Sequence, residues 1–245
     1  MSEEFFTFGQ GDSHIGGKVK PWKAESGTTY RLSFAWWPTG NDGQPDLGAP
    51  GSGKAPLFTG KQTNFIQGAG YVINQGAEYT KLANEPPRLR IATILIIWPT
   101  DKKGILAKDR LMDAEIKPWV ISGDKYKTLE QIHREFPFNE HDVTAKCEEG
   151  GAQFQKLTFS PCKENLFRQI LNNPKAKDLV DRILGDVASI SANINDHVGR
   201  KMTIQQIREK LANGSGAISG PVSGGDSGGA SAGDIDNIVG GLLDE

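Results

Sequence analysis

The sequence predicts a mainly β body that is followed by helices and by a separate acidic tail. Short apolar or aromatic runs separated by turn residues extend from Trp22 to about Phe159. Several strands at this spacing favour a small barrel or sandwich over a βαβ fold. After Pro161, apolar residues recur at helical spacing instead. The 245-residue chain then passes through a Gly/Ser-rich stretch into an acidic peptide.

Six strands are expected in the β-rich part. The run that begins at Tyr30 alternates apolar and polar residues in part, as a half-buried strand does. The longest apolar run is Ile91–Trp98, and the Pro50–Gly53 cluster belongs to a long loop. The predicted strands are Tyr30–Trp37, Asn64–Asn74, Arg88–Trp98, Ala114–Val120, Asp142–Cys147 and Gln153–Phe159.

Four helices are expected around and after this part. Thr128 is a candidate N-cap for the first, Pro174 separates the second from the third, and Asn213-Gly214 stops the last. Helices at the end of the chain are expected to pack on or beside the β-rich body. The predicted helices are Thr128–Glu135, Glu164–Leu171, Ala176–Ile190 and Thr203–Leu211.

The charge of the chain is unevenly divided. The net charge of −2 comes from 28 Lys and Arg against 30 Asp and Glu, which by itself argues against a nucleic-acid binder. Residues 213–245 hold five of those acids and no Lys or Arg. Residues 1–212 therefore carry 28 basic against 25 acidic residues, a net +3, beside −5 in the tail. The sequence thus predicts a modestly cationic body with its own anionic segment.

The tail has two parts. Residues 213–233 have the composition of a flexible Gly/Ser linker. Residues 234–245 place apolar side chains at i, i+3, i+4, i+7 and i+8 between acids, while Gly240 and Gly241 disfavour a free helix. We expect this acidic tip to become ordered only on a protein partner. Its residues include Asp234, Ile235, Asp236, Ile238, Val239, Leu242, Leu243, Asp244 and Glu245.

Membrane and secreted classes are not favoured. The run Ile91–Trp98 is far shorter than the roughly 20 residues of a membrane helix. The first residues, MSEEFFTFGQG, lack the basic-then-apolar order of a signal peptide. Cys147 and Cys162 are best interpreted as reduced thiols. We therefore expect a cytoplasmic protein without membrane contact.

Enzyme motifs are weak. The string Gly48–Lys54 fits a phosphate-binding loop, but Ala55 and Pro56 follow where a magnesium-binding Ser or Thr is needed. The chain has no H-E-x-x-H, no G-x-S-x-G and no C-x-x-C pair. His133 or His141 with the two cysteines lack the spacing of a metal site. We expect no catalytic residues, no metal and no cofactor, and a nucleotide hydrolase that uses Gly48–Lys54 is a minor alternative.

Aromatic and basic residues are interleaved in a pattern typical of single-strand binding. Cations neutralise phosphates, and each aromatic face that stacks on a base contributes about 1–3 kcal/mol. Most Trp and Phe residues in strands belong to a core, so the clusters carry more weight than any single residue. The expected nucleic-acid contacts are Lys20, Trp22, Arg31, Trp36, Arg88, Arg90, Trp98, Lys117, Trp119, Lys125, Tyr126 and Lys127.

A cationic body that is tethered to an acidic–apolar tip favours the same interpretation. The tethered anion can occupy the cationic groove when DNA is absent and leave it when DNA arrives. The tip is then available to recruit replication proteins. The alternative is an ordinary tail that maintains solubility, although solubility does not require a regular apolar stripe.

The order of these segments resembles the phage single-stranded-DNA-binding (helix-destabilising) proteins of the T-even type. The likeness covers roughly residues 20–245. The shared pieces are WKAESGTTYRLSFAWWP, KAPLF, ATILIIWPTDKKG, AEIKPWV and DVTAKCEEGGAQFQKLTF, followed by a helical region and an acidic terminus.

The resemblance implies a fold and a function. The fold is an OB-like barrel with a C-terminal helical extension and a disordered acidic tail, α+β overall. The function is to coat and protect single-stranded DNA in phage replication, recombination and repair, largely independently of sequence, in the host cell cytoplasm. The tip would recruit polymerase, helicase or recombinase.

The resemblance also implies roles for individual residues. Phe154 matches a hairpin aromatic along the DNA groove, and Lys156 follows in the same hairpin. Lys117 and Trp119 fall on a basic–aromatic strand, and Arg90 stands where the family has an aromatic residue. A guanidinium also stacks on bases, so Arg90 can keep the stacking role that the resemblance implies for this position.

Two departures from the family pattern change the expectations. The family's zinc module needs a His and three Cys, but residues 58–90 contain neither, so we expect no zinc. The family's basic N-terminal arm drives filament formation, whereas MSEEFFTFGQG is acidic. Self-association on DNA would therefore need another contact, for which Phe5, Phe6 and Phe8 are candidates.

The predicted organisation has five parts, and three rival functions stay open. The rivals are an RNA-binding or transcription-associated OB module, a virion structural or scaffold protein, and the nucleotide hydrolase. The parts are a flexible N-terminal arm (1–17), an OB-like single-strand-binding core (18–160), a helical extension (161–212), the linker (213–233) and the tip (234–245).

Overall fold

The computed structural model describes residues 14–15, 18–39, 44–48, 56–83, 85–148, 157–171 and 173–215. Several sequence predictions therefore lie outside the described residues. They concern Phe154 and Lys156, the string Gly48–Lys54 beyond its first residue, the acidic tip, and most of the N-terminal arm. Within that arm, β1 (His14–Ile15) pairs with β2 (Lys18–Val19).

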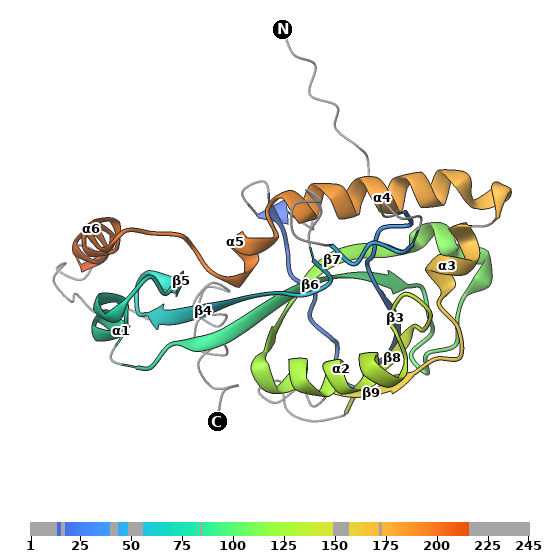
Figure 1. The fold of residues 1–245 in the computed structure, drawn as a ribbon, viewed down its shortest axis with the longest axis horizontal. Helices are drawn as coiled ribbons and strands as arrows, with labels where there is room; N and C mark the ends of the chain where they lie inside the picture. Colours follow the sequence, from blue (N-terminus) through green and yellow to red (C-terminus); the bar gives the residue numbers. More distant parts are fainter. Residues whose placement is uncertain are drawn as a thin grey trace, which may run out of the picture.

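One long strand, β6 (Arg88–Trp98), organises the main sheet (Figure 1). Along one edge it pairs with β7 from Arg90 to Ile97. Along the other edge, its first half pairs with β4 and its second half with β3, so two groups of strands leave the same edge and separate. The other strands are β3 (Thr29–Phe34), β4 (Thr59–Ile66), β5 (Gly70–Ile73), β7 (Glu115–Ser122), β8 (Val143–Cys147) and β9 (Leu157–Pro161).

The fold is mixed α+β, with an open antiparallel sheet of seven strands and several helices. The strand order among the described residues is β5-β4-β6-β3-β8-β9, with β7 on β6. No ladder joins β7 to β9 in this part of the chain, so a closed OB-like barrel is not found. Side chains meet across the opening instead, because the rings of Trp119 and Phe159 lie 5.9 Å apart.

The concave side of the sheet encloses an apolar core (Figure 1). Phe34 of β3 stacks on Phe138 at 4.1 Å between ring centroids. The helix α2 (Gly123–Glu135) inserts the fully buried Leu129 into the same cluster. Apolar burial of this kind contributes roughly 25 cal/mol per Å², so α2 helps to stabilise the side that the sheet leaves open.

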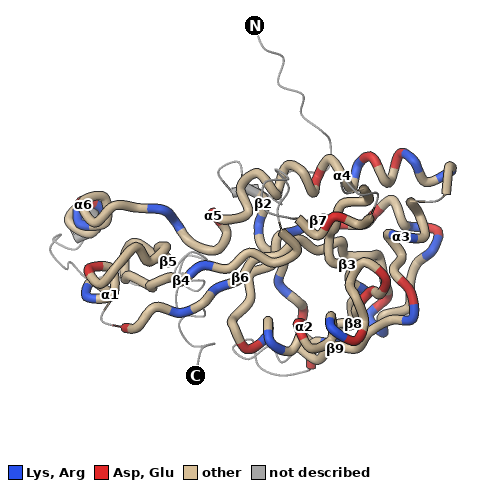
Figure 2. The backbone as a smooth tube through the Cα atoms, in the orientation of Figure 1, with Lys and Arg blue, Asp and Glu red and all other residues tan. Residues whose placement is uncertain are grey.

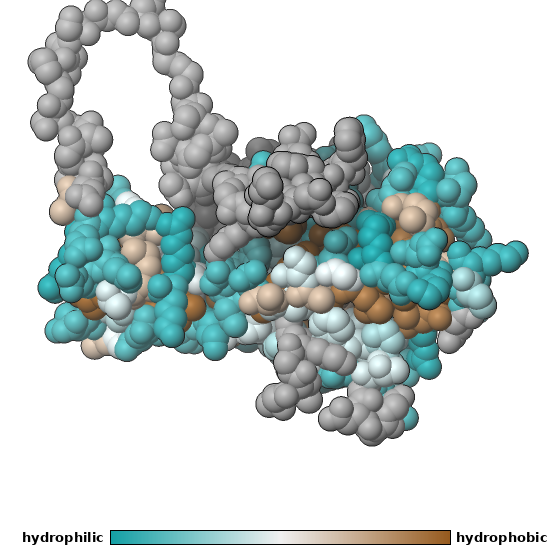
Figure 3. All heavy atoms as spheres, turned by 90° about the horizontal axis from the view of Figure 1, so that it is seen from above, coloured by the Kyte–Doolittle hydropathy of each residue, from teal (hydrophilic) through white to brown (hydrophobic). Residues whose placement is uncertain are grey.

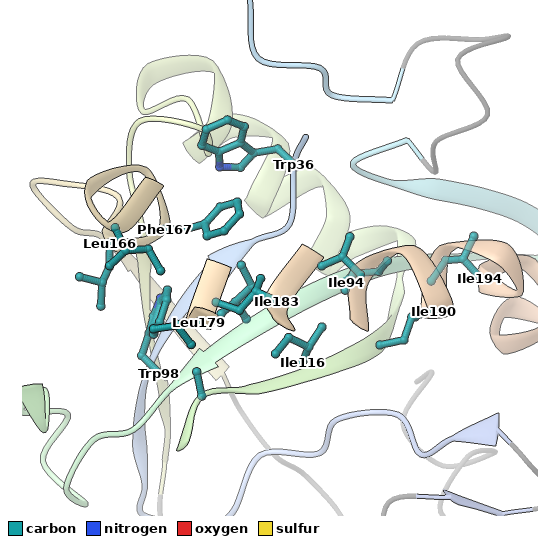
Figure 4. Close-up of a cluster of buried hydrophobic side chains, with 14 of the residues drawn as sticks. Trp36, Ile94, Trp98, Ile116, Leu166, Phe167, Leu179, Ile183, Ile190 and Ile194 are labelled. Carbon is teal, nitrogen blue, oxygen red and sulfur yellow. The ribbon is translucent and has the colours of Figure 1, made fainter. Parts of the chain in front are cut away.

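Three helices cover the other face of β6 and β7. The residues of α4 (Lys177–Ala192) that face the sheet are Leu179, Ile183, Val187 and Ile190, which recur at helical spacing and are buried. Figure 4 shows α4 side chains meeting those of the strands, with Trp36 and Phe167 beside them. These two rings lie 5.4 Å apart in an edge contact. The other helices on this face are α3 (Leu166–Leu171) and α5 (Ile194–Val198).

A separate lobe forms around the β4–β5 hairpin, at the left of Figure 1. Its helices are α1 (Ala77–Ala83) and α6 (Ile204–Ser215). Ile66 and Val72 of the hairpin pack with Tyr79 of α1 and Ile207 of α6. The Tyr79 hydroxyl donates to the Met202 carbonyl at 2.9 Å. The lobe therefore has a small apolar core of its own, in the interval where the resembled family places its zinc module.

A buried polar network ties β3, β6 and α3 to Asp142, which is fully buried. The Asp142 carboxylate accepts hydrogen bonds from Arg31 Nε at 2.8 Å, from Leu166 N at 3.0 Å and from the Ser33 hydroxyl. Ser33 Oγ in turn accepts from Trp98 Nε1 at 2.7 Å. Burial raises the pKa of Asp142, and the three donors oppose that rise.

The sequence placed most strands correctly and misjudged one hairpin. The predicted strand Asn64–Asn74 is two strands, β4 and β5, joined by a tight turn. Gly68 and Gly70 adopt φ values of +83° and +77°, a region that glycine alone enters without strain. Apolar runs on both sides of the turn hid this reversal, because hydrophobic periodicity does not reveal where the backbone adopts a positive φ.

Helix positions also differ from the prediction in part. Helix α2 begins at Gly123, five residues before Thr128, and α6 extends to Ser215, into the range assigned to the linker. The helices not predicted are α1, α5 and the two 3₁₀ helices η1 (Lys108–Asp113) and η2 (Pro174–Ala176). All four are shorter than the windows over which helical periodicity is detectable.

Replacement of Asp142 by Ala is expected to lower the free energy of unfolding by about 3 kcal/mol. The change leaves the buried Ser33 hydroxyl, the Leu166 amide and the Arg31 guanidinium without their shared acceptor. Urea denaturation measures the loss. The control is Glu130→Ala, which breaks an exposed ion pair with Arg134 and should change stability little. A loss equal to that control would contradict the structural role of the network.

Candidate nucleic-acid interface

The four tryptophans predicted to stack on bases are in the core. Trp22, Trp36, Trp98 and Trp119 are 6%, 3%, 1% and 5% exposed. Trp22, for example, meets the Trp119 ring edge-on at 5.3 Å. A stacking platform needs an accessible ring face, so the prediction that these residues contact nucleic acid is wrong. Trp98 and Trp119 are on strands whose two faces are covered, and Trp22 and Trp36 pack into the same cores from segments beside β3.

Two of the predicted cations are engaged within the protein. Arg31 is the ion-pair partner of the buried Asp142 and is only partly exposed, so its prediction as a DNA contact gains no support. Lys117 pairs with Glu115 on the same strand and is half-buried. Lys20 is exposed in the segment before β3.

The predicted cluster Lys125, Tyr126 and Lys127 lies on the first turns of α2. Tyr126 packs edge-on against Phe58 at 5.3 Å, and Lys127 is exposed, 3.9 Å from Asp124. The start of α2 lies beside Leu89 of β6, close to Gly123. Because side chains alternate along a strand, Leu89 points to the opposite face from Arg88 and Arg90. The structure therefore does not bring the α2 cluster onto the face that holds those two arginines.

Arg88 and Arg90 belong to a surface that we call the aromatic–cationic patch, formed by Lys61, Phe65, Tyr71, Arg88 and Arg90. The strand register pairs Lys61 with Arg90 and Phe65 with Tyr71, while Arg88 lies opposite Thr63 of β4. Residues paired in this way share a face of the sheet. The five side chains therefore project from one face of the first half of β6 and the β4–β5 hairpin.

The patch combines charge with aromatic surface at short range. The Arg90 guanidinium carbon lies 3.6 Å from the centroid of the Tyr71 ring, in a cation–π contact. Tyr71 and Phe65 meet edge-on, with centroids 5.1 Å apart. Both rings are half-buried, whereas Lys61 and Arg88 are exposed. The rings are thus held in place while their surroundings stay open to a ligand.

The charges around the patch are mostly positive. Arg88 has an exposed pair with Glu85 at 3.6 Å, a type of contact that contributes little and that a phosphate can replace. Arg200 joins the outer edge of β5, since its amide donates to the Tyr71 carbonyl at 2.9 Å. Burial lowers the pKa of Lys210, and the neighbouring Arg200 lowers it further. Figure 2 marks these basic residues along β4, β6 and the segment between α5 and α6.

The opposite face of the hairpin is covered, and the patch face is covered in part, because Gly199 lies against Thr63, which is 1% exposed. Lys61 and Arg88 stay exposed on the patch face. Ile66 and Val72 point away from the patch into the small core of the lobe. Seen from above, hydrophilic residues cover most of the lobe, whereas a hydrophobic band follows the body (Figure 3). A cationic surface with two anchored rings can neutralise phosphates and stack on unpaired bases.

Three residues of the patch were missed from the sequence: Lys61, Phe65 and Tyr71. A signal for the first two was present, because Lys61, Thr63 and Phe65 have the same parity along one strand. Tyr71 reaches them only through the turn at Gly68, which reverses the chain. Prediction of a single strand over Asn64–Asn74 had placed Tyr71 far from Phe65.

The described residues offer no alternative chemical site of the kinds considered from the sequence. They contain no group of three or more His, Cys, Asp or Glu side chains arranged to hold a metal ion. Cys147 and Cys162 are both free. No helix among them combines the length and apolarity that crossing a membrane demands.

Comparison with known proteins gives no match of any kind. No protein-family model matches the chain, and no curated protein or solved structure matches it. The functional interpretation therefore depends on the residues and their geometry.

Replacement of Trp98 by Phe should lower stability without weakening nucleic-acid binding. The change removes the Trp98 Nε1 hydrogen bond to Ser33 Oγ and leaves a gap in the core, a loss of about 1–3 kcal/mol. Affinity of the folded protein for oligo-dT should stay within about twofold, because the buried Trp98 side chain offers no ring face to a base. Urea denaturation and fluorescence anisotropy measure the two effects. A large loss of affinity with unchanged stability would restore Trp98 as a contact.

Proposed function

We propose that this protein is a non-enzymatic single-stranded-DNA-binding protein that coats and protects DNA strands in phage replication, recombination and repair, largely independently of sequence. The aromatic–cationic patch is the observation that carries the proposal. Its cations suit backbone phosphates, which are the same for every sequence, and its rings suit base faces, which every nucleotide offers.

The body is proposed to be a derivative of the OB-type barrel that is opened between β7 and β9. The curvature of the antiparallel sheet around one core supports this interpretation, as does the contact of Trp119 with Phe159 across the opening. In this interpretation the lobe is an insertion between the halves of the barrel, and β6 belongs to both the lobe and the barrel.

The acidic tip, residues 234–245, is proposed to recruit polymerase, helicase or recombinase and to compete with DNA for cationic surface. Its sequence supports both roles, because the acids suit the competition and the apolar stripe suits docking in a groove. The net charges of +3 and −5 in the two parts of the chain favour mutual attraction.

The first test of DNA binding changes the charges of the patch. The variant Lys61→Gln/Arg88→Gln should bind oligo-dT more weakly than the wild type, and the slope of log K against log salt should fall by about 1.4, or about 0.7 for each phosphate that is no longer neutralised. Fluorescence anisotropy between about 50 and 200 mM salt measures both quantities. The matched control is Lys163→Gln/Lys175→Gln, which makes the same change of charge at exposed positions away from the patch.

A ring variant separates stacking from charge. Tyr71→Ala should weaken oligo-dT binding by about 5- to 150-fold at constant salt and leave the salt slope unchanged. Absence of oligo-dT binding at low salt, in both the full chain and a tail-deleted form, would contradict the proposed function. Tighter binding of an RNA oligomer of matched length in direct competition would favour the RNA-binding alternative.

Removal of residues 234–245 should tighten oligo-dT binding, most strongly at low salt, because the tethered competitor is lost. The same truncation should abolish capture of purified replication proteins by the immobilised protein. A control chain of equal length, with the four acids of the tip changed to Asn or Gln, separates the charge of the tip from its apolar stripe. Unchanged affinity would exclude the competition and leave recruitment as the role of the tip.

A further inference from the structure

A polar hollow of about 520 Å³ lies at the far end of β6 from the patch. Its lining combines ammonium groups with side-chain hydroxyls and, within the described part of the chain, includes no carboxylate. The residues that line it are Gly27, Thr29, Lys102, Lys103, Thr144, Lys146, Thr158 and Ser160. The volume is within the range of small-ligand sites in proteins.

The strand register explains how the floor of the hollow is built. Lys146 of β8 lies opposite Thr29 of β3 and opposite Thr158 of β9, so these three side chains form a row across three strands. Thr144 and Ser160 form the next row on the same face. The hydroxyls of Thr29 and Ser160 make no hydrogen bond with other described residues, so they are available as donors.

A rigid turn holds the other two lysines at the rim. The Asp101 carboxylate accepts from the amides of Lys103 and Ile105 at 2.9 and 2.8 Å. Gly104 has φ of +84°, and a Cβ at this position would lie 2.6 Å from Thr29 Cγ2, so the turn packs directly on the floor. The amide of Thr29 donates to the Lys102 carbonyl at 3.1 Å. Lys102 and Lys103 are therefore carried on a fixed backbone.

The three lysines are exposed and unneutralised in the described structure. Lys102, Lys103 and Lys146 form no ion pair with any other described residue. Arg31 lies in the row of Thr144 and Ser160, and its charge is compensated by the buried Asp142. The hollow therefore has a local charge of about +3 beside hydroxyl donors, which is the chemistry that binds phosphate oxygens.

We propose that this hollow is a second binding site for phosphate groups, and that its occupant is the phosphodiester backbone of the bound strand. The choice of occupant rests on the proposed function, whereas the phosphate chemistry does not. The patch and the hollow lie at opposite ends of β6, which spans roughly 30 Å. By strand parity they are on the same face of the sheet, with α4 packed between them. A nucleic-acid strand that contacts both sites would pass over α4, which covers the sheet between them.

The test uses the variant Lys102→Gln/Lys103→Gln/Lys146→Gln in the full chain, with inorganic pyrophosphate and oligo-dT as separate probes. In the wild type, pyrophosphate should shift the amide NMR signals of the Lys102–Gly104 turn and of Thr158, and the variant should bind pyrophosphate at least tenfold more weakly. The oligo-dT salt slope should fall by about 2, or about 0.7 for each of three phosphates that the lysines neutralise. Ser160→Ala tests the floor and should weaken pyrophosphate binding without changing charge.

The control is Lys108→Gln/Lys163→Gln/Lys175→Gln, which makes the same change of charge at exposed positions outside the hollow. If pyrophosphate binds in the hollow but the variant and control share one oligo-dT slope, the phosphate site stands and its occupant is a free phosphate compound. If the wild type binds pyrophosphate there and does not bind oligo-dT, the proposed function fails and the site remains. If the variant and control behave alike with both probes, the proposal is overturned.

Discussion

The shared strand β6 is the constraint on which the other elements depend. Eleven residues, Arg88–Trp98, give hydrogen bonds to β7 on one edge and to both β4 and β3 on the other. A strand with three partners cannot shift register by one residue without exchanging its two faces. Such a shift would move Ile94 and Ile96, which now pack under α4, into the core on the opposite face of the sheet. The register of β6 therefore fixes where every other element lies, the two candidate phosphate-binding surfaces included.

Burial divides the aromatic residues by role. The indoles are in the body, where the sheet is covered on both faces, and they stabilise the fold. Phe65 and Tyr71 are in the lobe, on a hairpin face that the segment after α5 covers only in part. A half-buried ring is held by its neighbours and still offers surface, which fully buried Trp98 does not. We therefore expect nucleic-acid recognition on the hairpin face whose covering is incomplete.

The sequence predicted the strands and helices better than it predicted the site. Local patterns located β6 and α4, because both are long enough for periodicity to be distinct. Arg31 was assigned to DNA because composition alone does not distinguish a cation paired with Asp142 from a free one. The tryptophans were assigned to DNA because composition does not distinguish a buried ring from an exposed one. The open edge between β7 and β9 and the packing of α6 on the lobe depend on long-range contacts, and no local pattern encodes them. The polar hollow was also missed, since its lysines come from two segments more than 40 residues apart.

The position of α6 has a consequence for the order in which the chain folds. The lobe is formed by residues 59–83 and by Ile204–Ser215, which are separated in the chain by most of the body, from β6 to α5. During synthesis the β4–β5 hairpin leaves the ribosome well before the helix that covers it. Closing so long a loop is slow, so the lobe is completed last, after the body has formed around β6. The patch then acquires its final geometry only in a chain whose body is already folded.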